Sequence, residues 1–176
     1  MRLAFILSVL LMASCAKEQT IQKYFVQKTE DPNFVAVDLS PSFLNVDPTA
    51  LSAEGKKALD SFEKMNILAL RLNDSNQVAY KKELASVKDI LKNEQYQELM
   101  HFNGKGGGAS VKFVGTDENI EEFIVFANNK DMGFAVVRVL GDNMTPTDIM
   151  NFMDVLKQSK MDVDQLKPIQ DMMKGM

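Results

Sequence analysis

The sequence contains one cysteine, one histidine and no tryptophan among its 176 residues. A single cysteine cannot form a disulfide within the chain, so the fold must rest on its hydrophobic core. A zinc site built from histidine or cysteine needs several such ligands, and none is expected. One histidine would be enough for serine–histidine catalysis, but the Gly-x-Ser-x-Gly motif that often carries the serine is absent from the sequence. The histidine, His101 in Leu99-Met-His-Phe102, is therefore interpreted as an exposed or half-buried residue at a helix end.

Basic residues are slightly outnumbered, 20 against 24 acidic ones, and no stripe of them appears in the sequence. Binding to nucleic acid needs clustered lysine and arginine, so a nucleic-acid partner is not expected.

Long apolar runs are scarce as well. The only one, Leu3–Ala13, has 11 residues, broken by Ser8. A membrane-spanning helix needs about 20 apolar residues, so this run does not predict one.

The start of the chain instead has the pattern of a secretory signal: a basic residue at position 2, the apolar run, and then small residues. A core segment is disfavoured, because the run begins at the initiator methionine and ends abruptly in polar sequence. The residues Met12-Ala13-Ser14-Cys15 resemble the lipobox of bacterial lipoproteins, with methionine in place of leucine. This resemblance implies cleavage between Ser14 and Cys15, a diacylglyceryl group on the Cys15 thiol and acylation of the new amine. Two or three acyl chains give durable membrane anchoring.

A lipidated Cys15 would place the protein in the cell envelope. Ala16 is not the aspartate that retains many lipoproteins in the inner membrane, so the outer membrane, on its periplasmic side, is favoured. We predict a signal peptide at 1–14, a tether at 15–20, one domain at 21–160 and a tail at 161–176 that can form a short helix. Loss of residues 1–14 leaves 162 residues and changes the net charge from −4 to −5.

Apolar spacing predicts helices over 21–28, 52–65 and from 73–75 to about 92, and a capped helix that begins at Thr145-Pro146-Thr147-Asp148. Strands are predicted over 34–39, 66–72, 110–114, 120–127 and 134–140. The first strand–helix–strand segment suggests a parallel crossover, and the last three strands suggest an antiparallel meander. We therefore expect an α+β domain with a mixed five-stranded sheet and helices mainly on one face.

This order of elements and the lipoprotein-like start resemble a family of bacterial, Bacteroidetes-type lipoproteins of unknown function, over residues 20–160. The resemblance is carried by the strands Phe34–Ser40, Asn66–Asn73 and Phe134–Gly141 with the helix that follows. The family has no established activity, so the resemblance implies no catalytic residues.

Glycines gather at Gly104-Lys-Gly-Gly-Gly-Ala-Ser110. A phosphate-binding loop needs Gly-Lys-Ser/Thr opening a helix, whereas a strand is predicted here. A flexible surface loop before a hairpin is the interpretation.

Methionine is the unusual feature, because seven of twelve lie in the last 33 residues. Met150 and Met153 have the spacing of a thioether pair that could hold Cu(I). They could also form an adaptable surface for a partner, or pack in an ordinary core. No cofactor or metal is predicted.

Arg71 and Arg138 each interrupt an apolar strand, and Glu121-Glu122 opens another. If these strands adjoin, an Arg–Glu pair across strands is expected on the solvent face. Arg71, Arg138, Met150 and Met153 are the candidate binding residues.

The sequence favours a non-enzymatic, lipid-anchored envelope protein that binds a protein or another envelope component. An accessory role in envelope-stress signalling and a hydrolase using only Asp, Glu and Lys remain alternatives. The sequence does not indicate an oligomeric state.

Overall fold

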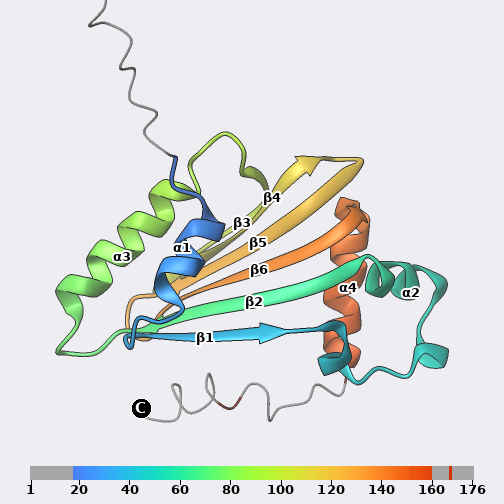
Figure 1. Ribbon diagram of the computed structural model, residues 1–176, viewed down its shortest axis with the longest axis horizontal. Coiled ribbons are helices and arrows are strands. Elements are labelled where there is room, and N and C mark those ends of the chain that lie inside the picture. The colour runs from blue at the N-terminus through green and yellow to red at the C-terminus, as the bar shows by residue number, and fades with distance from the viewer. Residues whose placement is uncertain (1–17, 160–166, 168–176) are drawn as a thin grey trace, which may run out of the picture.

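Six strands form one open sheet in the computed structural model, which describes residues 18–159 and Lys167 (Figure 1). Every neighbouring pair is antiparallel, and the order is β1-β2-β6-β5-β4-β3. The strands are β1 (Phe34–Leu39), β2 (Phe62–Arg71), β3 (Gln97–Gly104), β4 (Gly107–Thr116), β5 (Asn119–Asn129) and β6 (Gly133–Met144).

Helices cover both faces of this sheet. They are α1 (Ile21–Lys28), α2 (Ala53–Asp60), α3 (Gln77–Ile90) and α4 (Pro146–Gln158), with the 3₁₀ turns η1 (Pro41–Leu44) and η2 (Pro48–Ala50). In Figure 1, α1 and α3 lie in front of one end of the sheet, while α4 crosses behind the strands. Helix α2 packs beside α4.

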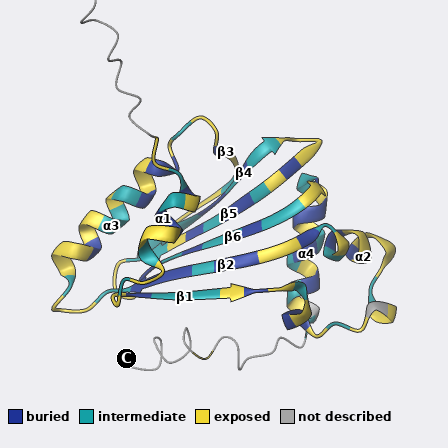
Figure 2. Cartoon of the chain, in the orientation of Figure 1, coloured by how far each residue is buried: buried dark blue, intermediate teal, exposed yellow. Residues whose placement is uncertain are grey.

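The two faces have separate cores because side chains alternate along each strand. In β5, Ile124 and Phe126 point toward α1 and α3, whereas Phe123 and Val125 point toward α4. We call these the α1/α3 face and the α4 face. Covered on both sides, the central strands carry nearly continuous apolar sequence. Figure 2 shows dark, buried segments throughout the middle of the sheet.

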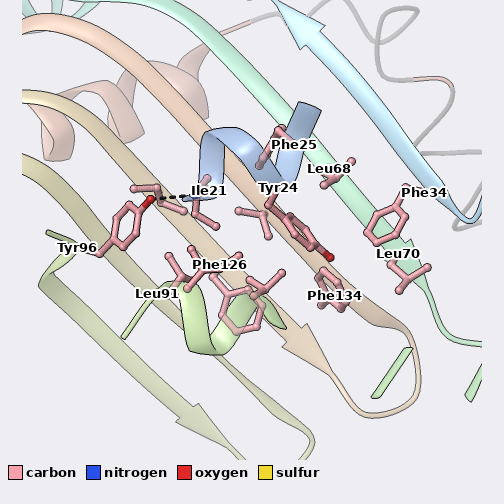
Figure 3. Close-up of a cluster of buried hydrophobic side chains, with 14 of the residues drawn as sticks. Ile21, Tyr24, Phe25, Phe34, Leu68, Leu70, Leu91, Tyr96, Phe126 and Phe134 are labelled. Carbon is pink, nitrogen blue, oxygen red and sulfur yellow. Dashed lines mark hydrogen bonds between the residues drawn. The ribbon is translucent and has the colours of Figure 1, made fainter. Parts of the chain in front are cut away.

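The core of the α1/α3 face is rich in aromatic side chains (Figure 3). Tyr24 of α1 meets Phe34 edge-on, and Phe34 meets Phe134 in the same way, each with ring centroids 6.2 Å apart. The start of α1 is fixed by a second contact. The Ile21 backbone N–H donates a 2.9 Å hydrogen bond to the buried Tyr96 hydroxyl. This bond joins the beginning of the described chain to the segment between α3 and β3.

The core of the α4 face is built on Phe152, whose ring lies 4.8 Å from that of Phe62 and 6.3 Å from that of Phe123. Helix α4 begins as its sequence predicts, with a capping box between Thr145 and Asp148 and a proline in the first turn. Burial raises the pKa of the Asp148 carboxyl, but hydrogen bonds from Thr145 and Lys57 outweigh burial and lower it overall.

The α+β class is confirmed, but the prediction of five strands in a mixed sheet is wrong. The helix expected over 52–65 ends at Asp60, and β2 starts at Phe62. Phe62 and Met65 fit a helical stripe equally well, yet both are buried in a strand whose Glu63 and Lys64 are exposed. The longer β2 lies antiparallel beside β1, so the predicted parallel crossover does not form.

The sixth strand, β3, has a weak sequence signal because it lies at the edge and has no fully buried residue. The prediction that helices lie mainly on one face is also wrong, because the two cores use opposite sides of the same strands. The predicted helix over 21–28 and the antiparallel meander of β4, β5 and β6 are confirmed.

Candidate functional site

A polar pocket of about 330 Å³ lies on the α1/α3 face, between α3 and the β3–β4 hairpin. Three lysines line it, Lys88 and Lys92 from α3 and Lys112 from β4, together with Glu98 and His101 from β3. The remaining lining residues are Leu91, Asn103, Gly107, Gly108, Ala109, Ser110, Phe126 and Asn128. With three lysines against one carboxylate, the lining has an excess of positive charge.

Hydrogen bonds and ion pairs hold part of this pocket in place. Lys112 Nζ donates to the Tyr96 carbonyl at 3.2 Å and lies 3.9 Å from Glu98 Oε2. Its side chain is only 17% exposed. Lys92 Nζ lies 3.6 Å from Asp89 Oδ1 at the surface, where an ion pair is weak and open to exchange with a ligand. The pocket therefore combines one largely buried lysine with two exposed ones.

His101 lies in β3, so the prediction that it ends a helix is wrong, although it is exposed as expected. Its Nε2 lies 3.1 Å from Asn103 Oδ1, and its Nδ1 lies 3.8 Å from Glu98 Oε2. Ser110 is directly opposite on β4. These side chains share one wall of the pocket.

The prediction of a loop before a hairpin is wrong for the glycine-rich segment, because it forms the tight turn of the β3–β4 hairpin itself and its residues from Gly107 on already lie in β4. The glycines of this segment allow the turn to pack closely against the neighbouring strand. A Cβ on Gly107 would lie 1.9 Å from the Asn128 carbonyl oxygen on the neighbouring β5. The turn thus lets the pocket wall approach β5.

A second hollow, of about 290 Å³, lies on the α4 face. Every residue that lines this apolar groove is apolar. Met153 and Leu156 contribute from α4, and Ile67, Val125 and Val137 contribute from the sheet. The other lining residues are Leu39, Phe43, Met65, Phe123, Val139 and Phe152.

The predicted Arg–Glu pair exists, between Arg138 Nη2 and Glu122 Oε2 at 2.6 Å. The prediction of a solvent-facing pair is wrong, because both side chains are only 12% exposed. Within the described part of the chain, Arg138 Nε is buried without a hydrogen-bond partner. Arg138 lines neither the polar pocket nor the apolar groove, so its contacts indicate a structural role.

The other candidate binding residues are separated from Arg138. Arg71 lies opposite Gly133 at the end of β2, five residues from Asn66, the partner of Arg138 in the register. This separation corresponds to about 17 Å along a strand. Met150 is 49% exposed on α4, and Met153 lines the apolar groove. Ser14 and Cys15 lie outside the described residues.

None of the described helices is both long and apolar enough to cross a bilayer. Likewise, residues 18–159 and Lys167 contain no group of three or more His, Cys, Asp or Glu side chains placed to hold a metal ion.

A model for a family described as a domain of unknown function, DUF4252, matches residues 24–152. The chain belongs to the DUF4252 family. No curated protein and no solved structure matches it. The DUF4252 match runs from α1 to Phe152 of α4, so it includes the whole sheet and the polar pocket. A family of unknown function was expected, while the lipoprotein character and bacterial origin stay predictions.

Sequence reasoning on this DUF4252 chain missed the lysine cluster. Lys88 and Lys92 are four residues apart, which places them on one side of α3, and this was a usable signal. Lys112 joins them only because β4 folds back beside the end of α3. A cluster assembled from a helix and a distant strand leaves no stripe in the sequence.

Proposed function

We propose that this DUF4252 chain is a non-enzymatic, lipid-anchored module of the bacterial cell envelope that binds phosphate-bearing lipid headgroups in its polar pocket. The observation that carries the proposal is the three-lysine lining of a pocket near the point where the described chain begins. The outer membrane, on its periplasmic side, is the proposed location.

The start of the described chain lies close to the pocket. The Glu18 carboxylate accepts a hydrogen bond from the Asn93 side-chain amide, and Asn93 follows Lys92 of the pocket lining. Cys15 precedes Glu18 by three residues, a reach of at most about 11 Å. A lipid on Cys15 would therefore hold this end of the domain against the membrane surface. This reach supports a headgroup as the ligand over a soluble molecule.

The chemistry of the lining suits a phosphate. Ammonium groups act as point charges toward phosphate oxygens, and each lysine near an anionic membrane contributes about 1 kcal/mol. The amides of exposed Asn103 and half-buried Asn128 on the same wall add uncharged donors. Glu98 opposes binding but also pairs with Lys112 and keeps that ammonium in place.

Vesicle binding tests the proposal. The full chain carrying Cys15→Ala, which has no lipid anchor, is titrated with phosphatidylcholine vesicles with and without phosphatidylglycerol. We expect binding only with phosphatidylglycerol, and weaker binding at high salt. Replacing the three pocket lysines by glutamine should lower the affinity about a hundredfold, given about 1 kcal/mol per lysine.

A control variant with the same change of charge replaces exposed lysines away from the pocket: Lys56→Gln, Lys64→Gln and Lys157→Gln. Its affinity should fall much less. Equal losses in the two variants would indicate general electrostatic attraction and not a pocket. Absence of vesicle binding at low salt would reject the headgroup assignment.

One observation favours a second candidate, a serine hydrolase, because Ser110 lies opposite His101 and Glu98 is near the ring. However, His101 Nε2 is paired with Asn103, and the 3.8 Å gap to Glu98 exceeds hydrogen-bond distance. Ser110 is also buried. Labelling by a fluorophosphonate that is lost in Ser110→Ala would favour the hydrolase, and no labelling is expected.

A further inference from the structure

From the geometry of the α4 face we infer that the apolar groove is the docking site of the chain's own C-terminal segment, residues 160–176. The inference concerns the face opposite the polar pocket and is independent of the headgroup proposal. It rests on the shape and composition of the face, on where α4 ends, and on the sequence that follows.

Helix α4 covers only part of its face. The cross-strand row Met65, Val139 and Phe123 lies beneath it in the core. The next row, Ile67, Val137 and Val125, is only partly buried and lines the groove. Two such rows are about 7 Å apart along a strand, and packed helices lie 8–10 Å apart. A second helix beside α4 would therefore lie over the groove.

The row beyond the groove consists of small side chains. Ala69, Ala135, Ala127 and Ala109 are paired in register across four neighbouring strands, with Val35 next to Ala69 on β1. From β1 to β4 this row measures about 19 Å at the usual strand spacing. Small side chains lower this part of the sheet surface and let a helix backbone approach closely. The row alone does not select an occupant.

The occupant follows from where the described chain ends. Leu156, in the last turn of α4, lines the groove together with Leu39 at the end of β1. Figure 1 shows α4 ending on the β1 side of the sheet, and 17 residues follow Ser159. A segment of this length can return across the sheet without a long linker. Any other molecule would have to compete with a ligand already tethered at the edge of the site.

The sequence of the segment fits an apolar groove. Leu166, Ile169, Met173 and Met176 have the spacing of one helix face, and Met172 lies beside them. Residues 166–176 as a helix would measure about 16 Å, close to the width of the alanine row. Methionine side chains adapt to irregular surfaces, and Met153 of α4 lines the groove with the same chemistry.

Thiol protection tests the docking. Val137→Cys, in the full chain carrying Cys15→Ala, places the only thiol in the groove. We expect its reaction with a thiol reagent to become about tenfold faster when Leu166→Asp and Ile169→Asp are added, because charged side chains cannot dock. Lys174→Asp lies away from the apolar side of the same helical pattern and brings the same change in net charge, so it should leave the rate unchanged.

Val78→Cys is the reagent control, because this side chain is 85% exposed on α3 and should react equally fast in all variants. A disulfide between Val137→Cys and Ile169→Cys should form within one chain, at a rate independent of protein concentration. A disulfide-linked dimer would assign the groove to a second copy. Equal thiol rates with and without the aspartates would reject docking of the segment.

Discussion

The ion pair between Arg138 and Glu122 offers a sharp test of how this fold is stabilised. Both side chains are 88% buried, and Arg138 Nε has no hydrogen-bond partner within the described residues. A buried pair is costly to break from one side, because the remaining charge is left unpaired. Arg138→Met and Glu122→Leu should each lower the free energy of unfolding by about 3 kcal/mol.

The double variant should behave differently. Replacing both charges by apolar side chains leaves no unpaired charge and removes the unsatisfied Nε, whose burial costs about 1–3 kcal/mol. We expect a stability within about 1 kcal/mol of the parent chain, or higher. The two substitutions would then be strongly non-additive, with a coupling energy of several kcal/mol.

Urea unfolding followed by far-UV circular dichroism is the assay, because the chain has no tryptophan. The chain carries Cys15→Ala throughout, and equal slopes against urea would show that the unfolded states are comparable. The pair Asp154–Lys157 is the control, since its atoms are 2.7 Å apart but its side chains are 62% and 72% exposed. Its removal should cost less than about 0.5 kcal/mol. A double variant as unstable as the sum of its single substitutions would mean that the two buried charges do not compensate each other.

Three further outcomes follow from the structure. Asp148→Asn should cost about 1–2 kcal/mol at neutral pH through loss of the cap and the Lys57 pair. Because the fold lowers the pKa of this carboxyl, its contribution is present above the unfolded value of about 3.9 and disappears as the pH falls below it. Urea titrations of parent and variant should therefore converge in acid, and a constant difference would contradict this. Phe152→Ala should cost about 3–5 kcal/mol in the same assay, since the ring is 3% exposed between helix and sheet. A loss below 1 kcal/mol would mean that α4 is not packed as described. Gly133→Ala should cost about 3 kcal/mol or more, because φ is +129° and a Cβ would lie 2.1 Å from the Leu70 carbonyl oxygen. Unchanged thermal unfolding would show that the β5–β6 turn is built differently.

Local chemistry made parts of this fold predictable. The capping residues at Thr145 and Asp148 located the start of α4, and strict apolar spacing located α1 and α3. Alternation and short joins located the meander. In each case the signal lies within a few residues of the element that it specifies.

Long-range pairing was not predictable in the same way. No residue near Phe34–Leu39 indicates that β1 pairs with β2 in the antiparallel direction. The edge strand β3 buries few apolar residues, so its sequence has no clear strand pattern. The arrangement of the candidate site could not be predicted for the same reason. The Arg138–Glu122 pair was foreseen from residue types, but its burial depends on packing above the sheet. The lysine pocket depends on the meeting of α3 and β4.

The proposed function depends most on the lipid at Cys15, which would bring the polar pocket to the membrane. Mass spectrometry of the amino-terminal fragment of the native protein tests this directly. We predict a fragment that begins at Cys15 and carries a diacylglyceryl thioether and an acylated amine. A fragment that begins at Met1 with an unmodified thiol at position 15 would contradict the account.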